Sequence, residues 1–156
     1  GGGEMIREVT MENVTYGEPP HRFEAGTPAI VPAIGLGVAL DYMASFGMDA
    51  IAAHEAELLA YGTERLSEIN SLKLVGTSAN KGAILSFIVE GAHPHDISTV
   101  IDRAGVAVRA GHHCAQPAMD RFGVTGTCRA SFSMYNTKAE VDALAEAIGN
   151  AIKFFG

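Results

Sequence analysis

The chain has no tryptophan and only two cysteines, Cys114 and Cys128, among its 156 residues. Small secreted domains that rely on disulfides carry more cysteines, so we expect two reduced thiols and no disulfide framework. The sequence shows no basic stretch followed by an apolar one at its N-terminus, and no uncharged apolar run long enough to cross a bilayer. We therefore expect a cytoplasmic protein that does not act at a membrane.

Positive charge is also scarce, because 11 Lys and Arg residues stand against 18 Asp and Glu residues, for a formal net charge of -7. Proteins that bind nucleic acid need a basic face, so no nucleic-acid partner is expected. Apolar residues make up 47% of the chain and charged residues 19%, which is typical of a globular domain with a core. A small-molecule substrate or a protein partner is the better expectation.

Hydrophobic periodicity predicts an α/β fold with helices over a small sheet. Residues 1–27 are expected to be an irregular arm with one short strand at 5–10. Helices are predicted from Pro28 to a stop at Gly47, from a cap at Asp49 to about 69, at 96–104, and after a capping box of Thr137 and Glu140. Strands are predicted at 72–75, 83–89, 106–109 and 128–134, so residues 28–156 should form one small domain with about four strands.

The residues that most suggest chemistry surround Cys114, in the loop Arg109-Ala110-Gly111-His112-His113-Cys114-Ala115-Gln116-Pro117. The loop follows a predicted strand, and α/β proteins often place reactive groups in such loops. A cysteine reacts as its thiolate, which positive charge on Arg109, His112 or His113 would favour, and a histidine could accept the thiol proton. The alternative is an inert small core residue. The polar neighbours favour a nucleophile.

Arg129 lies in an apolar predicted strand, Cys128-Arg129-Ala130-Ser131-Phe132. A charged side chain is rarely buried without a partner. The planar guanidinium suits a carboxylate, so Arg129 either binds an acidic ligand or pairs with an acidic residue of the fold, and the pattern favours neither. Cys128 is predicted to be a core thiol.

Five residues of types that bind zinc occur in two short runs: His93, His95, His112, His113 and Cys114. Their spacings do not match those of permanent zinc sites, so no metal is expected. His93 and His95 are then expected to lie in a solvated turn before a helix.

Thr27 precedes Pro28 at the start of the first predicted helix. Its hydroxyl either caps that helix or, with backbone N–H groups at the helix start, holds a phosphate. The local pattern by itself favours the cap.

Four segments occur in an order that resembles one family closely: Gly1-Gly2-Gly3-Glu4-Met5-Ile6, Arg22 to Pro28, Val108 to Pro117, and Cys128 to Phe132 with Tyr135-Asn136-Thr137. Together they are similar to the C-terminal part of SufS-type cysteine desulfurases, which are pyridoxal 5'-phosphate enzymes with the class V aminotransferase fold. The resemblance implies that residues 28–156 are the small C-terminal domain of a fold type I enzyme. Residues 1–27 would belong to a large cofactor-binding domain.

The resemblance also implies a reaction, in which L-cysteine becomes L-alanine and its sulfur remains on Cys114 as a persulfide. A SufE- or SufU-like acceptor protein would take that sulfur for iron–sulfur cluster assembly. Acceptors that contain zinc would engage His95. Selenocysteine lyase or cysteine sulfinate desulfinase activity, or a cofactor-free sulfur-carrier or docking domain, remain as alternatives.

The family pattern assigns a role to each candidate site residue. Arg129 and Arg109 would bind the substrate, and His112 and His113 would belong to the active-site loop. Thr27 would reach the cofactor phosphate across a homodimer. No lysine of the chain lies in a cofactor-binding motif, so the lysine that bonds the cofactor is expected outside it, and the chain alone is expected to be inactive.

Overall fold

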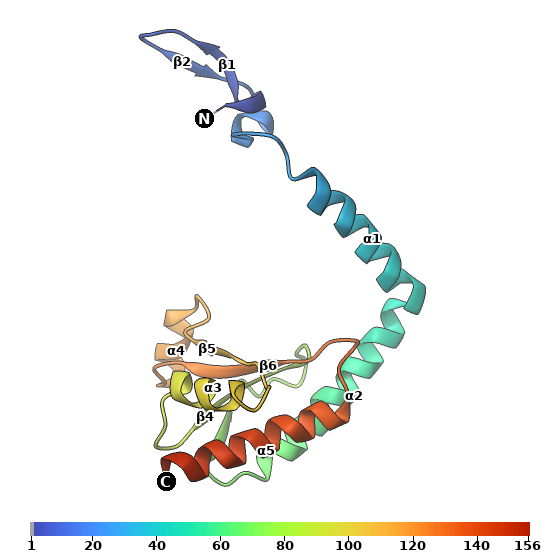
Figure 1. The fold of residues 1–156 in the computed structure, drawn as a ribbon, viewed down its shortest axis with the longest axis vertical. Coiled ribbons are helices and arrows are strands. Elements are labelled where there is room, and N and C mark those ends of the chain that lie inside the picture. The colour runs from blue at the N-terminus through green and yellow to red at the C-terminus, as the bar shows by residue number, and fades with distance from the viewer. Residues whose placement is uncertain (1) are drawn as a thin grey trace. The chain divides into compact units, whose positions relative to one another are not determined.

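The computed structural model describes residues 2–156, and the chain divides into two compact units, one ending at Gly47 and the other running from Met48 to Gly156. The ribbon is shown in Figure 1. The predicted boundary between residues 27 and 28 concerns a larger protein and stays a prediction.

The N-terminal unit opens with a hairpin (Figure 1). A short 3-10 helix at Gly3–Met5 leads into β1 (Ile6–Val9), which pairs antiparallel with β2 (Val14–Tyr16), and a second 3-10 turn follows at His21–Phe23. The backbone N–H of Asn13 donates to the Thr10 hydroxyl at 3.0 Å, which closes the hairpin turn. The strand predicted at 5–10 is confirmed. Its partner β2 was not predicted, because three residues carry too little periodicity.

Helix α1 spans Ile30–Phe46 and ends at Gly47 as predicted. Gly47 has a φ of +85°, which favours glycine at a helix end. The helix begins after Ala29, and no side chain caps it, so the interpretation of Thr27 as the cap is wrong. Large apolar side chains are exposed all around α1: Ile30, Val31, Ile34, Leu36, Val38, Leu40, Tyr42 and Phe46. Helices with apolar residues on every side are typically buried against other parts of a protein.

The C-terminal unit holds one sheet and four helices. Its elements are α2 (Met48–Ser67), β3 (Leu72–Val75), β4 (Ile84–Val89), α3 (Pro94–Asp102), β5 (Arg109–Gly111), α4 (Gln116–Phe122), β6 (Thr127–Ser131) and α5 (Lys138–Phe155). The strand order is β3-β4-β6-β5, and every neighbouring pair is antiparallel. The predicted α/β class and the four-stranded sheet are confirmed.

The core lies on one face of this sheet, against α2, α3 and α5. Side chains alternate along a strand, so Leu85, Phe87 and Val89 of β4 are buried while Ser86 and Ile88 lie on the other face. Cys128 and Ala130 of β6 join the core in the same way, which directs Arg129 to the opposite face. Polar contacts also join α2 to α5, since Asp142 accepts hydrogen bonds of 2.8 Å from both Tyr61 and Arg65.

Several predicted boundaries differ from the structure, and one short helix was not predicted. The last strand, predicted at 128–134, is β6 at Thr127–Ser131, and the helix predicted at 96–104 is α3 at Pro94–Asp102. The second helix begins at Met48, so Asp49 lies in its first turn and is not its cap. The strand predicted at 106–109 is β5 at Arg109–Gly111, because it pairs only where it lies beside β6. Helix α4 was not predicted, because seven residues beginning Gln116-Pro117 are too short to show a helical stripe. The capping box of Thr137 and Glu140 is confirmed.

Among residues 2–156, no single helix has the length and apolar character needed to cross a membrane. Helices α1 and α2 satisfy that test only when taken together as a bent pair.

Candidate active site

Cys114 lies in the loop between β5 and α4, and its side chain is exposed. His113 and Cys114 have φ values of 56° and 57°, in the left-handed region that residues other than glycine seldom adopt. Each such residue costs on the order of 1–3 kcal/mol and persists only where its surroundings hold it. One local tie is the hydrogen bond of 3.0 Å from the N–H of Ala115 to the carbonyl of His112. The thiol is thus presented on a strained backbone.

Two glycines close the base of this loop. Gly111 has a φ of +126° and pairs with Thr127 at the end of β5. A Cβ on Gly126 would lie 3.2 Å from both the carbonyl carbon and the oxygen of Gly111, which is tighter than most real contacts. The end of β5 and the approach to β6 can therefore lie this close together because both positions are glycine.

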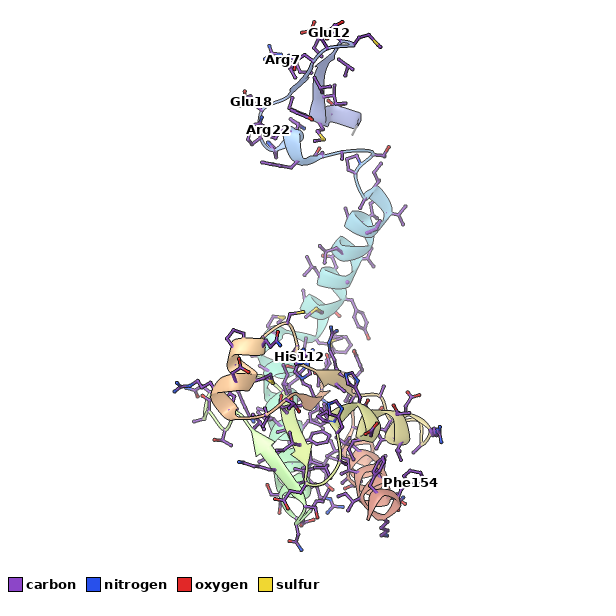
Figure 2. The ribbon with its side chains drawn as sticks, turned by 90° about the vertical axis from the view of Figure 1, so that its left-hand side faces the viewer. Arg7, Glu12, Glu18, Arg22, His112 and Phe154 are labelled. Atoms are coloured by element: carbon purple, nitrogen blue, oxygen red, sulfur yellow. The ribbon has the colours of Figure 1, made fainter. Side chains whose placement is uncertain are left out.

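His113 is held by Thr127, which is fully buried. The Nε2 atom of His113 lies 2.8 Å from the Thr127 hydroxyl and 3.1 Å from the Thr127 carbonyl oxygen. Burial lowers the pKa of His113, and the positive charge of Arg129 lowers it further. Its Nδ1 atom is buried and has no hydrogen-bond partner among the described residues. His112, by contrast, is exposed, and it is labelled in Figure 2.

Arg109 and Arg129 are direct cross-strand partners on β5 and β6. Partners in antiparallel strands share a face, and like charges placed opposite one another repel. Among the described residues neither guanidinium forms an ion pair, and Nε of Arg129 is buried without a hydrogen-bond partner. Pairing of Arg129 with an acidic residue of the fold is therefore not observed in residues 2–156, and the two side chains suit an anion.

Cys128, unlike Cys114, is buried. It is 1% exposed, and its thiol donates to the Pro94 carbonyl at 3.1 Å. Burial raises the pKa of Cys128 to about 11, so it stays a thiol near neutral pH. The prediction of a core thiol is confirmed.

His95 lies at the foot of the Cys114 loop. Its Nε2 is 3.9 Å from the point that a Cβ on Gly111 would occupy. The ring of His93 stacks on the ring of His95 with centroids 5.4 Å apart, and both side chains are exposed at the start of α3. Within residues 2–156, no three His, Cys, Asp or Glu side chains converge in a metal-binding group.

Thr27 belongs to the N-terminal unit, where it is exposed and precedes α1. None of the four lysines lies in the Cys114 loop. Lys138 pairs with Glu57 at 2.5 Å, and Lys81 donates to the Gly76 carbonyl at 3.1 Å. Lys73 and Lys153 lie on β3 and in the last turn of α5.

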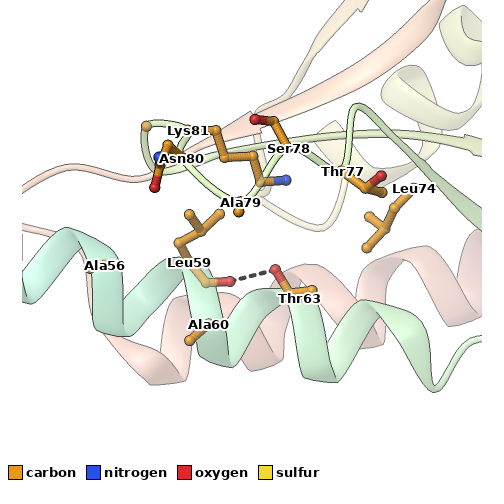
Figure 3. Close-up of a pocket in the computed structure, with 11 residues that line it drawn as sticks. Ala56, Leu59, Ala60, Thr63, Leu74, Thr77, Ser78, Ala79, Asn80 and Lys81 are labelled. Atoms are coloured by element: carbon orange, nitrogen blue, oxygen red, sulfur yellow. Dashed lines mark hydrogen bonds between the residues drawn. The ribbon is translucent and has the colours of Figure 1, made fainter.

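A groove of about 830 Å³ in the C-terminal unit contains none of the predicted site residues. It lies between α2 and the segment 77–82 that joins β3 to β4 (Figure 3). Leu59 and Leu74 line it, and the Thr63 hydroxyl in its wall is already bonded to the Leu59 carbonyl at 2.7 Å. Its lining holds no thiol, no histidine and no ionisable group other than Lys81, so the Cys114 loop remains the candidate site.

The structure thus brings together Arg109, Arg129, His113 and Cys114 around β5, β6 and the loop that follows β5. Sequence reasoning missed Thr127. Its role depends on the pairing of β6 with β5, and strand register cannot be read from an isolated threonine.

Comparisons with known proteins identify the family to which the chain belongs. Residues 1–144 match the family described as aminotransferase class-V. A probable cysteine desulfurase of Streptomyces coelicolor is 49% identical over 100% of this chain and 38% of its own length. A cysteine desulfurase of Synechococcus elongatus is 52% identical over 94% of this chain and 24% of its own length. The chain therefore spans well under half the length of these relatives.

Solved structures show the same fold. The cysteine desulfurase CsdA of Escherichia coli, in an S-sulfonic acid form, has a TM-score of 0.82 and 35% identity over 100% of this chain and 39% of its own. An apo cysteine desulfurase of Thermococcus onnurineus has a TM-score of 0.81 and 38% identity over 98% of this chain and 38% of its own. Enzymes of this group use pyridoxal phosphate. With the family model matching most of its residues, the chain belongs to the class V aminotransferase family and has the fold of the pyridoxal-phosphate-dependent cysteine desulfurases.

Proposed function

We propose that the full-length protein carrying this chain is a cysteine desulfurase that moves sulfur from L-cysteine to Cys114. The observation that carries the proposal is the exposed thiol of Cys114 on a strained loop that follows β5. Beside this loop, Arg109 of β5 faces Arg129 of β6, and neither has a carboxylate partner among the described residues. A thiol and a pair of guanidiniums are what an amino-acid substrate with a reactive sulfur and a carboxylate requires.

In this proposal the thiolate of Cys114 attacks the substrate sulfur. The Sγ–S bond forms as the Cβ–S bond of the substrate breaks, and the electron pair stays with the substrate carbon. That carbon then takes a proton, so L-cysteine and a thiol become L-alanine and a persulfide. Because Cys128 is buried and its pKa is raised, it takes no part in this step.

The two histidines of the loop have different tasks. His113 is tied to Thr127 through Nε2, so its ring is fixed. His112 is exposed, which leaves its ring available to take up the proton that Cys114 releases. The two arginines orient the substrate carboxylate, and Arg129 offers a buried Nε–H that no protein group uses among the described residues.

Pyridoxal phosphate, when bound, supplies the electron sink that such an amino-acid reaction needs. The residues of this chain suit the binding of the substrate beside the cofactor and one contact with the cofactor phosphate. Thr27 is exposed and is not engaged as a helix cap, so its hydroxyl is available for a phosphate across a homodimer. None of the four lysines, Lys73, Lys81, Lys138 and Lys153, lies in a cofactor-binding motif. We therefore propose that the chain alone is inactive.

We further propose that the sulfur passes to a SufE- or SufU-like acceptor for iron–sulfur cluster assembly. His95 supports this choice, since it is exposed at the foot of the Cys114 loop and stacked against His93. An exposed imidazole at that place is suited to contact a zinc-containing acceptor as it docks over the thiol.

The test compares two single-cysteine changes in the full-length protein supplied with L-cysteine and a reducing agent. We expect Cys114→Ala to abolish release of alanine and sulfide, and Cys128→Ala to retain it, because only Cys114 is exposed. Alanine release by Cys114→Ala at the wild-type rate would contradict the proposal. A preference for selenocysteine or cysteine sulfinate in the same assay would assign the protein to those activities instead.

A further inference from the structure

We propose that Thr127 and His113 form a clamp that positions Cys114, with His113 held as a neutral imidazole whose proton is on Nε2. Thr127 then acts as a positioning residue, since it is fully buried and bonds to His113 of the loop. The effect of the clamp on turnover rests on the function proposed above, whereas the clamp itself is a property of this chain.

The contacts of His113 determine its tautomer. Nε2 lies 3.1 Å from the Thr127 carbonyl oxygen, which can only accept a hydrogen bond. Nε2 must therefore carry a proton, and the same N–H points at the Thr127 hydroxyl, 2.8 Å away. Burial of the ring, together with the nearby positive charges of Arg129 and Arg109, disfavours a second proton on it. The neutral ring that results bears its lone pair on the buried Nδ1.

Strain in the loop shows why a clamp is needed. Two successive residues, His113 and Cys114, are left-handed, and neither is a glycine. Relaxation of that backbone would move the thiol. Within residues 2–156, the side chain of His113 is what bonds this pair of residues to the sheet. Thr127 is fully buried and pairs with Gly111 at the root of the loop, so it provides a rigid anchor.

The first test uses the 156-residue chain and needs no cofactor. In amide hydrogen exchange, we expect Thr127→Val to lower the protection of the Ala115 N–H about tenfold, because the buried ring loses its nearest acceptor. Thr127→Ser keeps the hydroxyl and should restore the protection. The matched control is Thr125→Val, because Thr125 is an exposed threonine in the segment between α4 and β6. This substitution should leave the protection of the Ala115 N–H unchanged.

A second variant and a direct readout support the first. If Thr127→Val does not fold, His113→Gln removes the other partner of the contact. It should give the same tenfold loss of protection at the Ala115 N–H. Nitrogen-15 spectra of the histidine rings near pH 7.5 should show His113 neutral and protonated on Nε2. Unchanged protection in both variants, or a proton on Nδ1 alone, would overturn the clamp.

In the full-length protein, we expect Thr127→Val to lower kcat about tenfold with the KM for L-cysteine nearly unchanged, and Thr127→Ser to recover the rate. That split follows because the clamp orients the nucleophile, whereas the substrate carboxylate is assigned to Arg109 and Arg129. A rise in KM with kcat unchanged would overturn the positioning role. Absence of any desulfurase activity in the wild-type protein, with the exchange result intact, would refute the proposed function and leave the clamp standing.

Discussion

Arg129 should weaken the fold that holds it. Its guanidinium is directly opposite that of Arg109, and its buried Nε has no partner among the described residues. An unsatisfied buried polar group costs about 1–3 kcal/mol, and like charges in a cross-strand pair add about 0.2–1 kcal/mol. Arg129→Met keeps much of the side-chain length and removes both costs. We expect the chain to gain about 1 kcal/mol or more in its free energy of unfolding.

The same substitution should impair the full-length protein. A charge-assisted hydrogen bond to a carboxylate contributes about 1.5–3 kcal/mol, so its loss should raise the KM for L-cysteine by roughly tenfold to a hundredfold. Stability and substrate binding would then change in opposite directions, which is the signature of a residue kept for its ligand and not for the fold.

The control is Arg65→Met, which removes an arginine that the fold does use. Arg65 donates to Asp142 at 2.8 Å and also pairs with Glu68, so its loss should lower the free energy of unfolding slightly and should not raise it. Urea denaturation of the wild-type chain and the two variants measures both effects. A loss of 1 kcal/mol or more in Arg129→Met would refute the reasoning, because it would mean that the fold itself pairs Arg129.

Two further predictions concern glycines and pH. Gly62→Ala in α2 should destabilise the chain, because the new Cβ would lie 3.0 Å from the side chain of the core residue Leu85. Gly149→Ala in α5 places its Cβ where no atom lies within 4 Å, so it should raise the free energy of unfolding by about 0.5–1 kcal/mol. Equal denaturation midpoints for the two variants would contradict this. The pKa of His113 is lowered in the fold, so the unfolded chain binds the proton more readily, and stability should be full above about pH 6.5 and fall below it. His113→Gln should lose less stability than the wild type between pH 7.5 and pH 5.5 in the same denaturation assay, and an equal loss in both would contradict the assignment.

The sequence predicted the parts of the fold that local signals control. Gly47 ends α1, and Thr137 with Glu140 caps α5, because each signal acts within one helical turn. Strands β3 and β4 were predicted from alternation. The start of β5 was not, because a three-residue strand is defined by its neighbour β6 and not by its own residues.

The candidate site shows the same division. Cys114, His112 and Arg109 were recognised from the loop itself, since Gly, His and Cys together are unusual in a core. The pairing of Arg109 with Arg129 depends on strand register, and the contact between His113 and Thr127 spans 14 residues. Such relations appear only once the sheet is assembled. The sequence alone could not decide between a ligand and a structural partner for Arg129.

The central claim is that Cys114 carries the sulfur, and mass spectrometry of the full-length protein after brief exposure to L-cysteine without reductant tests it most directly. Peptide mapping should show a gain of about 32 Da, one sulfur atom, on the peptide that contains Cys114 and none on the peptide that contains Cys128. Alanine production with no added mass on Cys114 in wild-type protein, or with the added sulfur on Cys128, would contradict the account.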